Sequence, residues 1–227
     1  MIPFTLAEEI RTILLDYLTT TFNLQDRKLE EALIAFLQQK QGGLFKGPYI
    51  QLRLPFRKVS QEVTIPLTIK PGFVPYVHQY KSFQRLTSQA DHNPEPTLVT
   101  TGTGSGKTEC FLFPVLDYCY QHRNKPGIKA IILYPMNALA TDQSNRLARL
   151  IHNDDRLSGA VTAGLYIGGE GQKHTAMGED HLIEDRETIR RNPPDILLTN
   201  YKMLDFLLLR PEDKKLWANN QPETLRF

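Results

Sequence analysis

Apolar and polar positions follow different patterns in two parts of this chain. Between residues 1 and 60, apolar side chains first recur at helical spacing and then alternate with polar ones. From residue 71 onward, short apolar runs of strand length alternate with longer amphipathic stretches. The change predicts two parts: a small helical and extended N-terminal unit over residues 1–60, and an α/β domain over residues 71–227.

The N-terminal pattern predicts two short amphipathic helices that form a hairpin. Thr5 opens a capping-box pattern before the first apolar stripe, and Asp26 can cap the second helix. The glycine pair at 42–43 is expected to end that helix. Alternation over residues 50–56, and again over 63–69, predicts two extended segments after the hairpin.

The larger unit has the order strand, helix, strand, helix, which predicts a parallel sheet with helices on both faces. In such sheets, ligands bind at the carboxyl ends of the strands. The predicted strands are residues 97–100, 129–134, 161–167 and 195–199, and the predicted helices are residues 107–122, 138–151 and 183–191.

Residues 98–108 read LVTTGTGSGKT, a short apolar run, a glycine-rich turn and the start of a helix. The backbone N–H groups of such a turn point at an anion, and the positive end of the helix dipole adds to the attraction. Lys107 is then placed to reach the β- and γ-phosphates of a nucleotide, and Thr108 to hold Mg²⁺. This pattern predicts a site for ATP and Mg²⁺, lined by Thr103, Gly104, Ser105, Gly106, Lys107, Thr108 and Glu109.

An aromatic and a glutamine precede this turn. Gln79 has an amide that can read an adenine edge, and Tyr76 can stack on the ring, although Phe73 competes for that role. The spacing resembles the adenine-reading Q motif of superfamily 2 helicases. A polar start of a helix is the simpler alternative.

Together with YPMNALATDQ at 134–143 and ILLTNYKML at 196–204, these segments resemble the first RecA-like domain of superfamily 2 DEAD/DEAH-box helicases. Within that superfamily they are most similar to the Lhr-like and YprA-like bacterial helicases. The resemblance implies a RecA-like P-loop fold. It also implies a nucleic-acid interface that contains Pro135, Asn137, Gly168, Gly169, Thr199 and Asn200. Either asparagine could instead serve only as a helix cap.

The family's ATPases also need an Asp-Glu box that holds Mg²⁺ and positions water, and we find none in residues 1–227. We therefore expect an N-terminal piece of a longer protein that has a second RecA-like domain. Residues 225–227 look like the opening of the strand that carries the box. Alone, the chain is expected to bind ATP weakly without turnover.

The leading interpretation is the ATP-binding part of a helicase or translocase, with DNA preferred to RNA, in DNA repair or phage defence with partner proteins. A non-catalytic, nucleotide-gated binding module is the alternative, and a small-molecule kinase is a weaker third. The net charge of +2 does not by itself indicate nucleic-acid binding. The sequence has no membrane segment or signal peptide, and Cys110 and Cys119 fit buried packing in a reducing compartment, so we expect a cytoplasmic protein.

Overall fold

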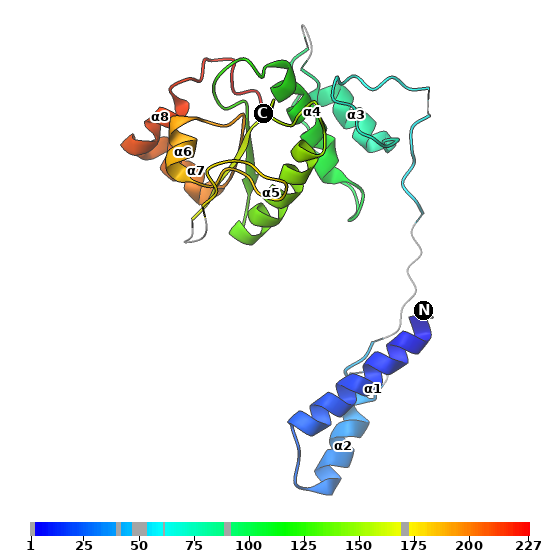
Figure 1. The fold of residues 1–227 in the computed structure, drawn as a ribbon. Helices are drawn as coiled ribbons and strands as arrows, with labels where there is room; N and C mark the ends of the chain where they lie inside the picture. Colours follow the sequence, from blue (N-terminus) through cyan, green and yellow to red (C-terminus); the bar gives the residue numbers. More distant parts are fainter. Residues whose placement is uncertain (1–2, 40–41, 47–53, 61, 89–91, 169–172) are drawn as a thin grey trace. The chain divides into compact units, whose positions relative to one another are not determined.

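The computed structural model describes residues 3–39, 42–46, 54–60, 62–88, 92–168 and 173–227. The chain divides into two compact units, Met1–Pro55 and Phe56–Phe227 (Figure 1). Lys58 forms an antiparallel bridge with Tyr76, which places the residues around Lys58 in the larger unit. No helix in the described ranges is long and apolar enough to cross a membrane.

The smaller unit contains the predicted helical pair, α1 (Pro3–Thr21) and α2 (Arg27–Leu37). Asp26 caps α2 as predicted, because its carboxylate accepts hydrogen bonds from two backbone N–H groups of the first turn. The predicted start of α1 is wrong: the helix begins at Pro3, so Thr5 lies inside it. Proline suits a first helical position because its φ is preset and it lacks the N–H that would go unpaired there.

The predicted end of α2 is also wrong. The helix ends at Leu37, and the N–H of Gln38 closes the last turn on Ile34. Gly42, with φ of +88°, lies in the following loop, from which Leu44 N–H bonds back to Leu37 O at 3.0 Å. The glycine therefore reverses the chain after the helix and does not terminate it.

The predicted extended segments do not form strands among the described residues. Residues 50–53 of the first segment lie outside the described ranges, and residues 54–56 are in no strand. In the second segment, the N–H groups of Thr68 and Ile69 bond to the carboxylate of Asp117, each at 2.7 Å. These donors are satisfied by a helix side chain, so the segment packs on a helix and not in a sheet.

The larger unit has the predicted α/β architecture. Its described helices and strands are α3 (Val77–Leu86), α4 (Lys107–Gln121), β1 (Ala130–Tyr134), α5 (Asn137–His152), β2 (Ala163–Tyr166), α6 (Arg186–Arg191), β3 (Ile196–Asn200), α7 (Tyr201–Leu209), the 3₁₀ turn η1 (Pro211–Asp213) and α8 (Lys214–Trp217). Within the described ranges, three strands pair in parallel in the order β1-β3-β2. The helix expected over 183–191 starts later, because Asp185 accepts a hydrogen bond from Thr188 N–H and caps α6.

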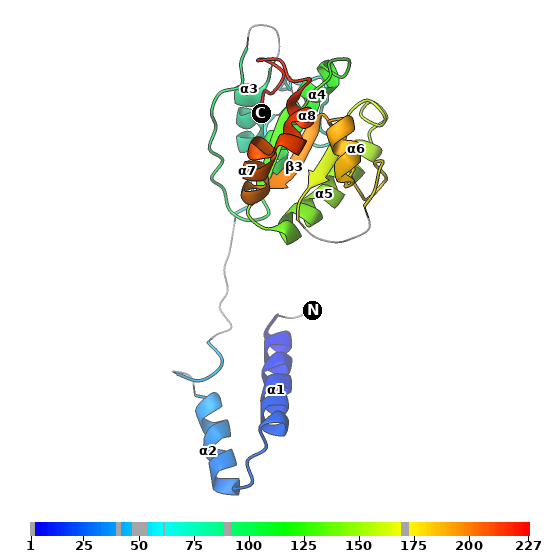
Figure 2. The ribbon, with the colours of Figure 1, turned by 90° about the vertical axis from the view of Figure 1, so that its left-hand side faces the viewer.

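Helices cover both faces of this sheet (Figures 1 and 2). Alternate strand residues face opposite sides, so Leu198 belongs to one apolar cluster and Leu197 to the other. The first cluster includes residues of α3, α4 and α5, and the second includes residues of α6, α7 and α8. The buried faces predicted from the apolar runs are therefore confirmed.

Residues 97–100 do not form the predicted strand. They have no ladder partner among the described residues, and Leu98 is 87% exposed. The apolar run is present, but an isolated segment cannot pair its backbone groups.

The last residues pair with the free edge of β1. Phe227 N–H donates to Lys129 O at 3.2 Å, and Ile131 N–H donates to Phe227 O at 2.9 Å. These two bonds have the pattern of a parallel pair, so Phe227 lies beside β1, although residues 225–227 form no strand. That they open the strand of the Asp-Glu box stays a prediction.

Both cysteines lie on α4 and are buried, as predicted. Burial raises the pKa of the Cys110 thiol and raises the pKa of the Cys119 thiol well above its ordinary value. Thiols with raised pKa values are poor nucleophiles and poor metal ligands, so the two side chains act as packing.

Candidate nucleotide and nucleic-acid site

The glycine-rich loop leads directly into α4. Gly104 and Gly106 have φ values of +73° and +72°, in the left-handed region where glycine is favoured. At Gly106 the space is also closed, since a Cβ would lie 2.4 Å from Gln79 Nε2. The loop conformation therefore depends on glycine for both backbone and packing reasons.

Lys107, the first residue of α4, turns back over the loop. Its Nζ donates to the carbonyl oxygens of Thr101 at 3.0 Å and Gly102 at 2.8 Å. In the part of the chain that the structure describes, the Lys107 ammonium forms no ion pair. Its hydrogen bonds go to neutral carbonyl oxygens. An ammonium in this position is available to an anion that enters the loop.

Two side chains of α3 fasten the loop. His78 Nε2 lies 2.9 Å from Ser105 O, and Gln79 Nε2 donates to Gly106 O at 3.1 Å. A carbonyl oxygen only accepts, so Nε2 is the donor in this contact. The packing of α3 against α4 thus positions the last residues of the loop. No local sequence pattern pointed to the His78 contact.

Gln79 is 2% exposed, and both ends of its amide are engaged. Oε1 accepts from Tyr76 N–H at 2.8 Å, which caps α3, while Nε2 holds the loop. To read adenine, Gln79 must share or exchange one of these bonds. Its role as the adenine reader stays a prediction.

The two candidate stacking rings lie in different surroundings. Tyr76 stacks on the His78 ring with centroids 5.6 Å apart, beside the residues that hold the loop. Phe73 makes an edge contact with Phe113 of α4 at 5.9 Å and is 44% exposed. Tyr76 therefore reaches the loop indirectly, through the His78 ring that contacts Ser105 O. Which of the two rings stacks on adenine stays a prediction.

The other predicted cradle residues are distributed as follows. Ser105 is buried and its hydroxyl bonds to that of Thr101, while Thr108 is partly buried in the first turn of α4. Thr103 is exposed at the loop. Glu109 forms an ion pair with Arg146 of α5. Among the described residues, no group of three or more His, Cys, Asp or Glu side chains is placed to hold a metal ion. The role of the Thr108 hydroxyl as a Mg²⁺ ligand stays a prediction.

A second cluster links the carboxyl ends of all three strands. Asn137 Nδ2 donates to Gly168 O at 3.1 Å, and Asn200 Nδ2 donates to Asn137 Oδ1 at 2.7 Å. Asn200 Oδ1 also accepts from Met203 N–H at 2.8 Å and so caps α7. Asn137 and Pro135 are exposed, which leaves this junction open to a ligand.

Thr199 lies beneath that junction. It is fully buried, and its hydroxyl donates to Tyr166 O at 2.6 Å. In this conformation its side chain cannot reach a phosphate in solvent, because the bond joins β3 to β2 inside the sheet. Gly169, the remaining predicted residue, lies outside the described ranges.

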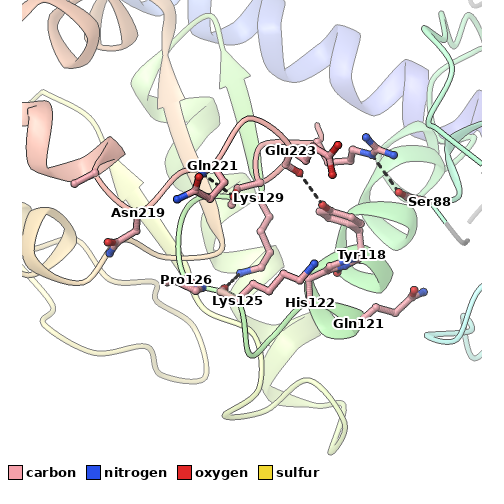
Figure 3. A pocket seen from close by; sticks show the side chains of 13 residues that line it. Ser88, Tyr118, Gln121, His122, Lys125, Pro126, Lys129, Asn219, Gln221 and Glu223 are labelled. Atoms are coloured by element: carbon pink, nitrogen blue, oxygen red, sulfur yellow. Dashed lines mark hydrogen bonds between the residues drawn. The ribbon is translucent and has the colours of Figure 1, made fainter. Parts of the chain in front are cut away.

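A large hollow of about 730 Å³ lies at the opposite end of α4 (Figure 3). Gln121 and His122 line it from the end of that helix, and Lys125, Pro126 and Lys129 from the segment that enters β1. Parallel sheets bind ligands at the carboxyl ends of their strands, whereas this hollow lies at the amino end of β1. It is separate from the glycine-rich loop.

Comparison with known proteins identifies the family of the α/β unit. The chain matches the DEAD/DEAH box helicase family over residues 76–222 and belongs to that family. It is 31% identical to the Druantia protein DruE of Escherichia coli over 95% of this chain and 17% of the relative.

Two further relatives are helicases by name. YprA of Bacillus subtilis, an uncharacterized ATP-dependent helicase, is 37% identical over 34% of this chain and 9% of its own length. The ATP-dependent RNA helicase rok1 of Neosartorya fischeri is 26% identical over 61% of this chain and 17% of its own. The chain thus spans less than a fifth of the length of each relative.

Replacing Gly106 by alanine is expected to disrupt the loop, because alanine is strained at a φ of +72° and its Cβ collides with the Gln79 amide. The strain alone costs roughly 1 kcal/mol or more, and the displaced amide releases Gly106 O. ATP affinity of the intact protein, measured by fluorescence anisotropy of a labelled analogue, should fall by about 10-fold or more. Gly159→Ala is the control, since Gly159 also has positive φ but its Cβ would meet open space. Equal losses in both variants would contradict the role of the Gln79 contact.

Proposed function

We propose that this chain is the ATP-binding part of a nucleic-acid-dependent ATPase, a helicase or translocase. One observation carries the proposal: a glycine-rich loop and an exposed asparagine junction occur in one α/β domain, and each lies at the start of a helix. The loop supplies N–H groups and the Lys107 ammonium to a triphosphate. The junction supplies the N-termini of α5 and α7 to a phosphate backbone.

In this proposal Lys107 holds the β- and γ-phosphates of ATP, and Thr108 holds Mg²⁺. The metal neutralises charge that develops on the phosphates when it is bound. His78 and Gln79 hold the loop through the carbonyl oxygens of Ser105 and Gly106. Gln79 also exchanges one of its amide hydrogen bonds for a bond to the adenine edge.

On the nucleic-acid side, Asn137, Asn200 and the exposed Pro135 contact the strand. Thr199 supports them from below by tying β3 to β2. The backbone of Gly168 completes the junction, since its carbonyl already accepts from Asn137. These contacts are to phosphate and sugar, so they hold a strand without reading its sequence.

We propose DNA as the track, in a repair or phage-defence setting with partner proteins. The support is the similarity of the loop and junction segments to Lhr-like and YprA-like bacterial helicases. The name of the rok1 relative makes RNA the alternative that an assay has to include.

The test is steady-state ATPase activity of the intact protein without nucleic acid, with single-stranded DNA and with single-stranded RNA of the same sequence. We expect DNA to raise kcat by about 10-fold or more, in line with the gating of turnover by conformational closure, and RNA to raise it less. Hydrolysis that neither polymer stimulates would contradict the proposal. ATP binding without any hydrolysis would favour the nucleotide-gated binding module.

A further inference from the structure

A charged contact joins the helix of the phosphate loop to the helix of the asparagine junction. Glu109 is the third residue of α4, and Arg146 lies in the middle of α5. Their side chains form an ion pair in which the carboxylate is 16% exposed and the guanidinium 45%. Asn137 begins α5, so one rigid helix carries both Arg146 and the junction.

The position of Glu109 calls for a neutralising partner. One carboxylate oxygen, Oε2, is buried without a hydrogen-bond partner, and it would lie 3.0 Å from a Cβ at Gly106. A carboxylate so close to the loop repels the phosphates of a bound nucleotide unless its charge is offset. Arg146 supplies the offsetting charge and holds the other oxygen on the side of α5.

Arg146 also acts on the end of β1. Burial raises the pKa of the Tyr134 hydroxyl, and the positive charge of Arg146 is the main influence that opposes the rise. Tyr134 is followed at once by Pro135 and the start of α5. The ion pair with Glu109 places the guanidinium beside the helix of the glycine-rich loop, and its charge acts on Tyr134, the last residue of β1 before the junction.

We propose that Arg146 is a positioning residue that couples nucleotide binding to nucleic-acid binding through its ion pair with Glu109. The proposal rests on the proposed function, because it needs two sites to couple. A nucleotide that moves Glu109 shifts α5 through the ion pair with Arg146. A nucleic-acid strand that moves α5 shifts the Glu109 carboxylate beside the phosphates through the same pair. The coupling is reciprocal, as linkage requires.

The experiment replaces Arg146 by methionine, which keeps the length of the stem and removes the charge. In the intact protein, the affinity for single-stranded DNA is measured by anisotropy with and without a non-hydrolysable ATP analogue, and ATPase kcat and KM with and without DNA. We expect the ratio of the two DNA affinities, and the stimulation of kcat by DNA, each to fall at least about fivefold, the lower range of allosteric coupling. Arg149→Met, on the same helix and exposed, should keep both ratios.

Two further variants separate coupling from folding. Arg146→Lys retains the charge and should recover part of the lost ratio of DNA affinities with and without the ATP analogue. The double variant Glu109→Arg with Arg146→Glu restores an ion pair of reversed charge, so its ratio should be closer to wild type than that of Arg146→Glu alone. Wild-type ratios in Arg146→Met, equal losses in Arg149→Met, or no recovery in the swap would overturn the proposal. If the wild-type protein itself shows no stimulation by nucleic acid, the proposed function fails and the coupling fails with it.

Discussion

Replacing Lys107 by alanine is expected to lower the ATPase kcat/KM of the intact protein by about 100-fold or more, the usual cost of losing a donor aimed at developing charge. In the structure the ammonium is held on two loop carbonyls and has no carboxylate partner among the described residues. Exchanging neutral carbonyls for phosphate oxygens is favourable, because charge-assisted hydrogen bonds are the stronger kind. A coupled-enzyme assay, together with ATP binding, measures the effect.

Lys125→Ala is the matched control. Lys125 is an exposed lysine beyond the far end of α4, where it lines the separate hollow. The control should hydrolyse ATP at the wild-type rate. Wild-type activity in Lys107→Ala would remove the assignment of the loop as the nucleotide site, since no other described lysine lies within it.

Replacing Asp195 by alanine is expected to lower the free energy of unfolding of the α/β unit by about 3–5 kcal/mol, the typical cost of breaking a buried ion pair from one side. Asp195 precedes β3 and pairs with Lys129, which is only 1% exposed. The second carboxylate oxygen accepts from Thr162 N–H at 2.7 Å and from its hydroxyl at 2.9 Å. The variant therefore leaves a buried ammonium without its counter-charge and unties the start of β2.

Hydrogen exchange read by mass spectrometry over β1 and β3 measures this loss within the intact protein. The double variant Asp195→Ala with Lys129→Met should be less destabilised than Asp195→Ala, because the second change removes the buried charge. Unchanged protection in Asp195→Ala, or a double variant worse than the single one, would show that the pair does not stabilise the sheet.

Parts of this fold followed from local sequence because their causes are local. The apolar runs mark β1, β2 and β3, of which β2 and β3 are buried on both faces, and helix periodicity marks α4 and α5. Asp26 was recognisable as a cap since its side chain bonds only to the next few residues. The errors at Thr5 and at the 42–43 glycine pair concern only where helices begin and end: Pro3 starts α1 before Thr5, and the last turn of α2 closes before the glycines.

The predictions of strands at residues 63–69 and 97–100 were wrong for a different reason. Residues 97–100 have the apolar composition of a strand, but a strand exists only where another backbone pairs with it. The N–H groups of Thr68 and Ile69 find a carboxylate almost 50 positions away, on Asp117. No local pattern reports such a partner.

The sequence by itself determined that a glycine-rich loop opens a helix of an α/β domain, because the glycines, Lys107 and Thr108 are adjacent in the chain. The phosphate chemistry predicted for them depends on that adjacency. Only the tertiary structure decided what surrounds them: the His78 and Gln79 bonds that close the loop, the burial of Thr199, and the pair between Glu109 and Arg146. These contacts join residues separated by 27 to 37 positions or lie inside the sheet. They arise from the packing of helices on the sheet, which the order of residues along one element does not contain.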